Sequence, residues 1–77
     1  MITQAQSRMA RAALGWGVRD LASKASVGVS TVTRFEGGYR DPIPATLAAI
    51  QRAFEAAGIE FTDGDGVRRR EPVEGGQ

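Results

Sequence analysis

Apolar residues recur at intervals of three and four through most of the chain, a spacing typical of helices with one buried face. The longest stripe begins after Pro44, which suits the first turn of a helix, and it stops at Gly58. Its members are Leu47, Ile50, Ala53, Phe54 and Ala57. Shorter patterns predict three earlier helices, over about residues 4–14, 18–25 and 29–36.

The first predicted helix has recognisable signals at both ends. Thr3 and Gln6 have the spacing of a capping box, in which each side chain accepts a hydrogen bond from the other residue's backbone N–H. Gly15 suits a C-terminal glycine cap. The inner face is expected to be thin and rich in alanine, formed by Ala10, Ala13 and Leu14, with Met9 or Ala5 at its margin.

A very short turn joins the second and third predicted helices. Trp16 and Leu21 have the spacing of a hydrophobic staple at the start of the second helix. In the third helix, Val32 and Phe35 share an inward face, and Gly28 occupies the N-cap without a side chain to offer. The outward face of this helix consists of Val29, Ser30, Thr33 and Arg34.

After Gly58 the apolar pattern changes to alternation, which is typical of strands. The pattern predicts a strand at 59–62, a turn at the letters DGDG and a return strand at 67–70, with Glu60 opposite Arg69. We therefore expect a helical domain over residues 1–58, a strand or hairpin over 59–70, and a polar tail over 71–77.

The composition removes several kinds of site. The chain has 77 residues with no cysteine and no histidine, so we expect one small domain without disulfides, thiolate or imidazole metal ligands, or histidine catalysis. The DGDG letters resemble the start of a calcium loop, but Arg68 stands where that loop needs glycine and Val67 where it needs an oxygen ligand. We expect no enzymatic activity, no metal and no cofactor.

The charge is unevenly distributed, although the net charge is only +1. Residues 1–58 contain seven basic and four acidic residues, whereas residues 59–77 contain three basic and five acidic ones. A mildly basic body is compatible with a polyanionic partner. The chain has no apolar run of membrane-spanning length and no secretory leader, so we expect a cytoplasmic protein with no membrane contact.

The segment GWGVRDLASKASVGVSTVTRFEGG resembles the helix-turn-helix domains of the phage-repressor family, also called Cro/cI or XRE. The positions that fall on the family pattern are Arg11, Gly15, Leu21, Ala22, Ala25, Val27, Ser30, Thr31, Val32, Arg34, Phe35, Glu36 and Gly37. The opening and the last helix also resemble short bacterial regulators of this family, so the resemblance covers about residues 1–62. It implies a mainly α, lambda-repressor-like bundle of four to five helices with a C-terminal β-strand or hairpin.

Several positions depart from the family pattern. Where the family has a small polar cap followed by glutamine, this chain has Gly17 and Val18, and Ser26 stands in place of the usual turn glycine. Gly28 replaces a serine or threonine cap, which costs little stability but removes a hydroxyl near the expected phosphates. Ser7 occupies a position that is usually apolar, so we expect it to thin the core.

The resemblance implies that the third helix enters the major groove of double-stranded DNA and that the protein regulates transcription, for example as a repressor. The residues expected to face the bases are Val29, Ser30, Thr33 and Arg34, of which Ser30 and Thr33 also suit phosphate contacts. Arg34 suits a bidentate contact with guanine, and Val29 suits a thymine methyl group. Phosphate contacts are expected from Arg19, Gly28, Tyr39 and Arg40.

The family further implies an ion pair between Arg11 and Glu36, which joins the first helix to the end of the third. Such domains usually bind DNA as homodimers. The expected dimer surface is the last helix together with residues 59–62, where Phe54, Ile59 and Phe61 exceed the needs of a thin core. Arg8 and the run Arg68, Arg69 and Arg70 remain open between solvent and DNA. The alternative function is a protein-binding module, such as an antitoxin or adaptor on the same fold. The expected location is the cytoplasm of a bacterium, in association with the nucleoid, for a bacterial or phage protein.

Overall fold

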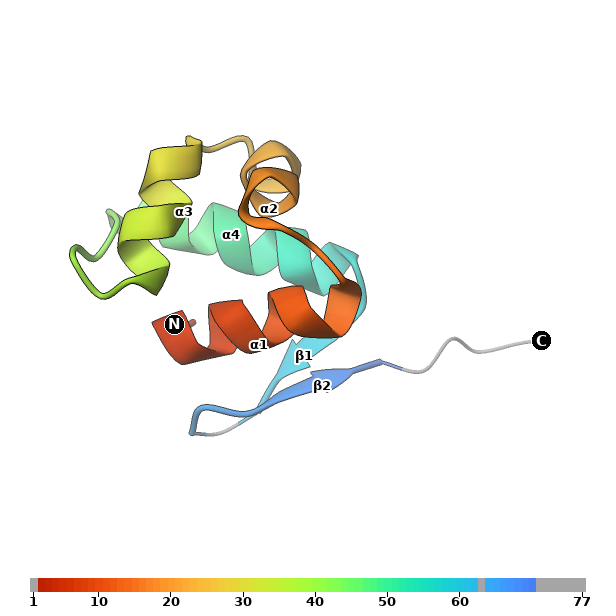
Figure 1. Ribbon diagram of the computed structural model, residues 1–77. Coiled ribbons are helices and arrows are strands. Elements are labelled where there is room, and N and C mark those ends of the chain that lie inside the picture. Colours follow the sequence, from red (N-terminus) through yellow and green to blue (C-terminus); the bar gives the residue numbers. More distant parts are fainter. Residues whose placement is uncertain (1, 63, 71–77) are drawn as a thin grey trace.

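The computed structural model describes residues 2–62 and 64–70, and within them the chain forms four helices followed by two strands (Figure 1). The elements in chain order are α1 (Gln4–Leu14), α2 (Val18–Ala25), α3 (Val29–Glu36), α4 (Pro44–Ala56), β1 (Ile59–Phe61) and β2 (Val67–Arg69). The prediction of a mainly helical fold with a C-terminal hairpin is confirmed. The polar tail predicted over residues 71–77 lies outside the described residues.

Local capping signals set the helix limits as the sequence predicts. The backbone N–H of Gln6 donates to Thr3 Oγ1 at 3.1 Å, and the N–H of Thr3 donates to Gln6 Oε1 at 3.0 Å, which completes the capping box of α1. Gly15 ends α1 in the left-handed conformation, with φ of 70°. Pro44 occupies the first turn of α4, where a missing N–H costs no helical hydrogen bond.

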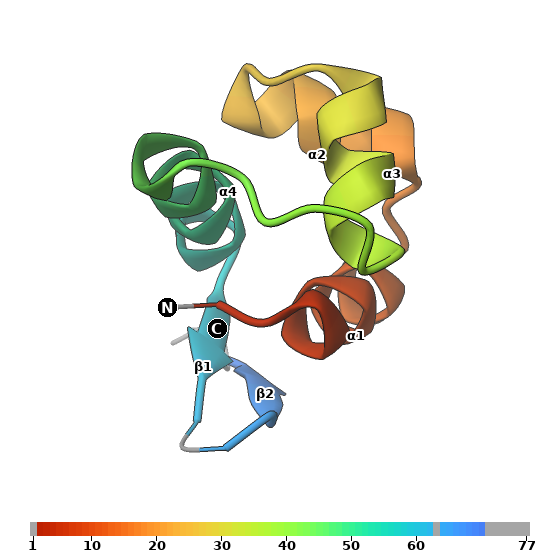
Figure 2. The ribbon, with the colours of Figure 1, turned by 90° about the vertical axis from the view of Figure 1, so that its left-hand side faces the viewer.

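The helices enclose one small core, with α2 packed against both α3 and α4 (Figure 2). Its fully buried large apolar side chains are Leu21, Val32, Ile50, Phe54 and Ile59. The ring of Phe54 stacks on Trp16 with centroids 5.7 Å apart and meets Phe61 edge-on at 6.0 Å. The last helix, the connection between α1 and α2 and the first strand therefore share a single aromatic cluster.

The inner face of α1 differs from the expected alanine stripe. Ala10 is buried as predicted, but Ala13 is exposed, and Gln6 and Ser7 are buried in its place. Both buried polar residues have hydrogen-bond partners distant in sequence, and these hydrogen bonds offset the cost of removing their polar atoms from water. Ser7 is fully buried at a position where the family pattern is apolar, and it also donates a hydrogen bond that the sequence does not predict.

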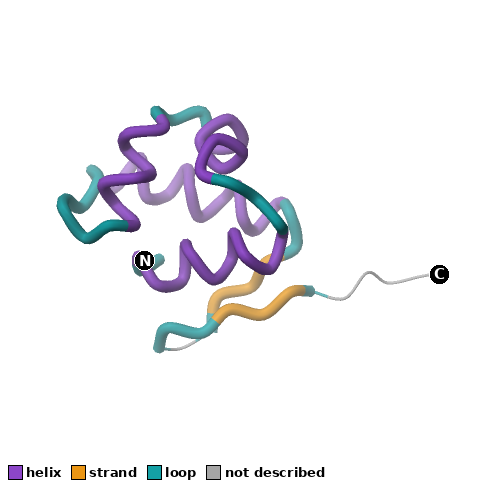
Figure 3. The backbone as a smooth tube through the Cα atoms, in the orientation of Figure 1, coloured by secondary structure: helices purple, strands orange, loops and turns teal. Residues whose placement is uncertain are grey.

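The two strands form a hairpin (Figure 3). They pair in a register one residue away from the predicted one. The sequence predicts Glu60 opposite Arg69, whereas the structure has Glu60 opposite Arg68 and Phe61 opposite Val67. The observed register places Phe61 and Val67 on one face, and both pack against the core. The predicted register would instead have set Phe61 against the charged Arg68.

Gln6 holds the turn of this hairpin against α1. Its side-chain amide donates to the carbonyl of Gly66 at 3.0 Å, and those of Gly64 and Thr62 lie 3.3 and 3.4 Å away. The side chain thus serves both the cap of α1 and the turn, because its Oε1 accepts from Thr3. The hairpin is therefore an integral part of the single-chain fold.

The predicted dimer surface needs correction at two of its three residues. Phe54 and Ile59 are fully buried inside one chain, so they have no exposed surface to offer a second copy. Phe61 is half-buried and packs on Phe54. A homodimer stays a prediction, and of these three residues Phe61 alone has exposed surface left for it. Among the described residues, no helix is long and apolar enough to cross a membrane.

Candidate nucleic-acid interface

The connection between α2 and α3 spans only Ser26, Val27 and Gly28. Ser26 adopts the left-handed conformation with φ of 57°, which usually belongs to glycine, and this reverses the chain at the end of α2. The N–H of Val27 donates to the Ala22 carbonyl at 2.9 Å and fixes the turn. The third helix consequently starts at a fixed angle to the second, on the outer side of the molecule (Figure 2).

The outward face of α3 contains the side chains that the sequence assigns to base contacts. Val29, Ser30, Thr33 and Arg34 are all exposed. On the opposite face, Val32 and Phe35 are buried in the core. The helix is thus anchored by its apolar side and leaves its polar side accessible to a partner.

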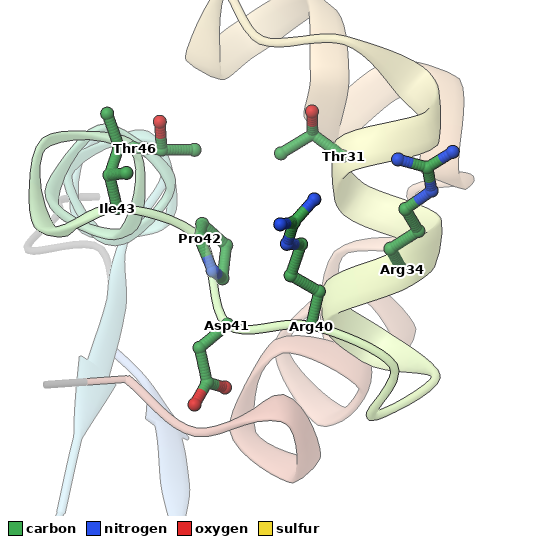
Figure 4. Close-up of a pocket in the computed structure, with 7 residues that line it drawn as sticks. All are labelled: Thr31, Arg34, Arg40, Asp41, Pro42, Ile43 and Thr46. Carbon is green, nitrogen blue, oxygen red and sulfur yellow. The ribbon is translucent and has the colours of Figure 1, made fainter.

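Arg34 and Arg40 both line a hollow between α3 and α4 (Figure 4). The hollow has a volume of about 460 Å³, and its other lining residues are Thr31, Asp41, Pro42, Ile43 and Thr46. Arg40 extends between the two helices, whereas the carboxylate of Asp41 points away from it (Figure 4). Within the described residues neither arginine forms a hydrogen bond or an ion pair, so both guanidinium groups are available to an anion.

Tyr39 extends this cationic region beyond the end of α3. Its side chain is 85% exposed, and it lines a second hollow with Thr33, Arg34 and Arg40. The N–H of Tyr39 donates to the Arg34 carbonyl at 3.0 Å, which fixes the loop against the end of the helix. The structure therefore brings four of the predicted DNA-contacting residues together at the C-terminal half of α3, namely Thr33, Arg34, Tyr39 and Arg40.

Two helices begin at exposed glycines. Gly17 caps α2, and its N–H donates to Asp20 at 2.8 Å; Gly28 caps α3 without a side-chain hydrogen bond. The N-terminal amides of α3 remain accessible, and such amides favour anions. Arg19 is exposed in the first turn of α2, with no hydrogen bond or ion pair to the rest of the described chain.

The Arg11–Glu36 ion pair expected from the family pattern is present at the other end of α3. Arg11 Nη2 lies 2.7 Å from Glu36 Oε1, and Arg11 Nε donates to both carboxylate oxygens at 3.0 Å. Its Nη1 also donates to the Trp16 carbonyl at 3.1 Å. The hydrogen bond to Glu36 raises the pKa of Arg11 above its usual value. The carboxylate is buried, so this pair fixes the end of α3 against α1.

Two further side chains of α1 contribute to this junction, and sequence reasoning missed both. Ser7 Oγ donates to Glu36 Oε2 at 2.6 Å, and Arg8 Nη1 donates to the Glu36 backbone carbonyl. Arg8 thereby gives a hydrogen-bond donor to a carbonyl that has no partner within the helix, at the C-terminus of α3. A cation at this end of a helix is also favoured by the helix dipole. The signal available in the sequence is a serine at a normally apolar position, four residues before the Arg11 of the expected ion pair.

The three C-terminal arginines have partners within the chain. Arg68 pairs with Glu60 at 2.5 Å, Arg69 donates to the Ala13 carbonyl at 3.3 Å, and Arg70 to the Glu55 carbonyl at 3.3 Å. Ala13 and Glu55 lie in the last turns of α1 and α4, whose free carbonyls attract cations. The hairpin lies below α1, whereas α3 lies above it (Figures 1 and 2). The run therefore braces the hairpin away from the exposed face of α3.

The exposed face of α3, the α3–α4 loop and the starts of α2 and α3 are the structural features from which a function can be argued. No protein-family model matches this chain, and no curated protein matches it either.

Proposed function

We propose that this protein binds double-stranded DNA sequence-specifically and regulates transcription, with α2 and α3 as a lambda-repressor-like helix-turn-helix. The observation that carries the proposal is the pairing of an exposed, polar α3 face with Arg34 and Arg40, which have no partner within the described residues. An exposed helix flanked by free cations suits the major groove, which admits an α-helix between two phosphate backbones.

In this proposal the residues divide into two groups. Those on the face of α3 contact base edges, and Arg34 donates two hydrogen bonds to one guanine, for which its fork geometry is suited. Those around it position the helix on the phosphates; they are Arg19, Gly28, Tyr39 and Arg40. The Arg11–Glu36 pair does not touch DNA but holds α3 at its angle.

A homodimer on two half-sites follows from the small size of one module, because a single helix buries little DNA surface. Since Phe54 and Ile59 are fully buried, the surface available to a second copy lies elsewhere. Analytical ultracentrifugation of the full chain, free and on its selected duplex, tests this part of the proposal separately.

The test of the DNA proposal is selection of bound sequences from a random duplex pool, followed by affinity measurements at several salt concentrations. We expect a defined sequence to be enriched and its affinity to fall steeply with salt, because bound counterions return to the DNA when the protein dissociates. Absence of enrichment, together with binding that does not depend on salt, would refute the proposal.

A second candidate function, a protein-binding module such as an antitoxin or adaptor, is favoured by one observation. Tyr39 and Ile43 are 85% and 68% exposed on the loop between α3 and α4. Exposed apolar side chains of this size are typical of protein contacts. A partner that binds wild type, but not the Ile43→Ser variant, with weak salt dependence would favour this function over DNA binding.

A further inference from the structure

The exposed face of α3 contains an apolar component that phosphate binding does not explain. Val29, at the first position of the helix, is 42% exposed and stands outside the hydrophobic core. Thr33 is exposed and lies four residues later, so the two side chains are neighbours on one helix face. Both are β-branched, which restricts their rotamers and presents methyl groups in a defined geometry.

The hydroxyl of Thr33 already forms a hydrogen bond within α3. Its Oγ1 donates to the Val29 backbone carbonyl at 3.1 Å. The side chain therefore has no free proton to donate to a base, and it presents a methyl group and hydroxyl lone pairs. Val29 has only methyl groups to present. Together these two residues form a ridge, hereafter the Val29–Thr33 ridge, that cannot donate a side-chain hydrogen bond.

The bases differ in what they offer to such a ridge. In the major groove, thymine alone of the four bases presents a methyl group, whereas guanine presents two acceptors that need donors. Bidentate readout of adenine needs asparagine or glutamine, and the exposed residues of α3, which the structure describes in full, include neither. The lone pairs of Thr33 can accept from the amino group of adenine or cytosine, but Val29 offers methyl groups alone. Apolar contact with thymine methyl groups is the match that uses both residues of the ridge.

We infer that the DNA site of this protein contains thymines whose C5-methyl groups pack against the Val29–Thr33 ridge, next to the guanine that Arg34 contacts. The inference deepens the proposed function and depends on it. It assigns specificity to two residues that do not have to form a hydrogen bond with a base.

The experiment replaces each thymine of the selected duplex, one at a time, by deoxyuridine, which lacks only the C5-methyl group. At a contacted position the affinity should fall about fourfold, the factor expected for one buried methyl group. Deoxyuridine outside the protected site is the control and should change nothing. If no position responds although the duplex binds with the expected salt dependence, this inference is overturned and the proposed function stands.

Variants identify the residues that contact those methyl groups. Val29→Ala should weaken binding up to about 15-fold, for two lost methyl contacts, and should abolish the response to deoxyuridine at one position. Because Val29 is outside the core, circular dichroism should show an unchanged fold. If the deoxyuridine response persists undiminished in Val29→Ala, then Val29 is not the contact and the assignment is wrong.

Thr33 is tested by two substitutions that separate its methyl group from its hydroxyl. Thr33→Ser keeps the hydroxyl but loses the methyl group, and it should bind the selected duplex about fourfold more weakly than wild type. Thr33→Val keeps the branched shape and loses the hydroxyl, and it should bind more tightly than Thr33→Ser. The opposite order would show that the hydroxyl, not the methyl group, contacts the base, and would overturn the inference for this residue. If neither wild type nor any variant binds a duplex in a salt-dependent way, the proposed function itself fails.

Discussion

The junction between α1 and the end of α3 yields the sharpest prediction about stability. Glu36 is 7% exposed and accepts hydrogen bonds from Arg11 and Ser7, so its charge depends on these partners for compensation. Replacing Arg11 by methionine keeps the hydrophobic stem but leaves the carboxylate buried with only Ser7. Removing one partner of a buried ion pair costs about 3–5 kcal/mol.

The lower end of that range applies here, because 21% of the Arg11 side chain is exposed and water can reach the vacated position. We therefore expect Arg11→Met to lower the free energy of unfolding by about 3 kcal/mol. A domain of 77 residues has a total stability of about 4–12 kcal/mol, so the variant loses a large share of it. The double variant Arg11→Met, Glu36→Met should recover most of the loss, since no charge then remains buried.

Urea unfolding followed by circular dichroism measures these differences, with the m-value as a check that both variants unfold from a compact state. Arg52→Met is the matched control, because Arg52 is exposed on α4 and forms no hydrogen bond or ion pair within the described residues. The reasoning is refuted if Arg11→Met differs from this control by less than about 0.5 kcal/mol, or if the two substitutions at the junction are additive.

Three further predictions concern the helix ends and the hairpin. Gly28→Ser should raise the free energy of unfolding by a few tenths of a kcal/mol, because the new hydroxyl caps α3. A Cβ at this position meets only Thr31 Oγ1, at 3.6 Å, so the side chain fits. A lower melting temperature would contradict this. Ser26→Gly should stabilise the fold by about 1 kcal/mol by relieving a left-handed conformation, and a destabilised variant in thermal denaturation would disprove it. Ile59→Ala should lower the free energy of unfolding measured in urea by about 2–5 kcal/mol, because Ile59 is fully buried. The loss should be the same at all protein concentrations, since the burial lies within one chain. A loss that depends on protein concentration would instead place Ile59 at an interface between chains.

The features that the sequence predicts well depend on neighbours within one helical turn. The limits of α1 follow from Thr3, Gln6 and Gly15, and the start of α4 follows from Pro44; each is a local signal. The inward and outward faces of α3 follow in the same way from the spacing of Val32 and Phe35. The exposure of the candidate DNA-contacting residues was therefore predictable.

The features that the sequence does not predict depend on residues that are distant along the chain. Ser7 is buried because it meets Glu36, 29 positions later, and Gln6 because it meets the carbonyl of Gly66, 60 positions later. The hairpin register depends on which side chains reach the core, and Val67 could not be placed before the core was known. The sequence places Ile59 at a surface for a second copy, because the packing of β1 against this chain's own α4 cannot be read from it.

The central claim is that the exposed face of α3 recognises a DNA sequence, and Arg34→Ala tests it most directly. Its affinity for the selected duplex and for a scrambled duplex is compared with wild type and with Arg52→Ala. Arg52 follows Thr46 by six residues, about 240° around α4 and thus away from the hollow next to α3. We predict that Arg34→Ala binds the selected duplex about 5- to 150-fold more weakly, with scrambled-duplex binding and Arg52→Ala almost unchanged. Wild-type affinity of Arg34→Ala for the selected duplex, or an equal loss on both duplexes, would contradict base recognition by this face of α3.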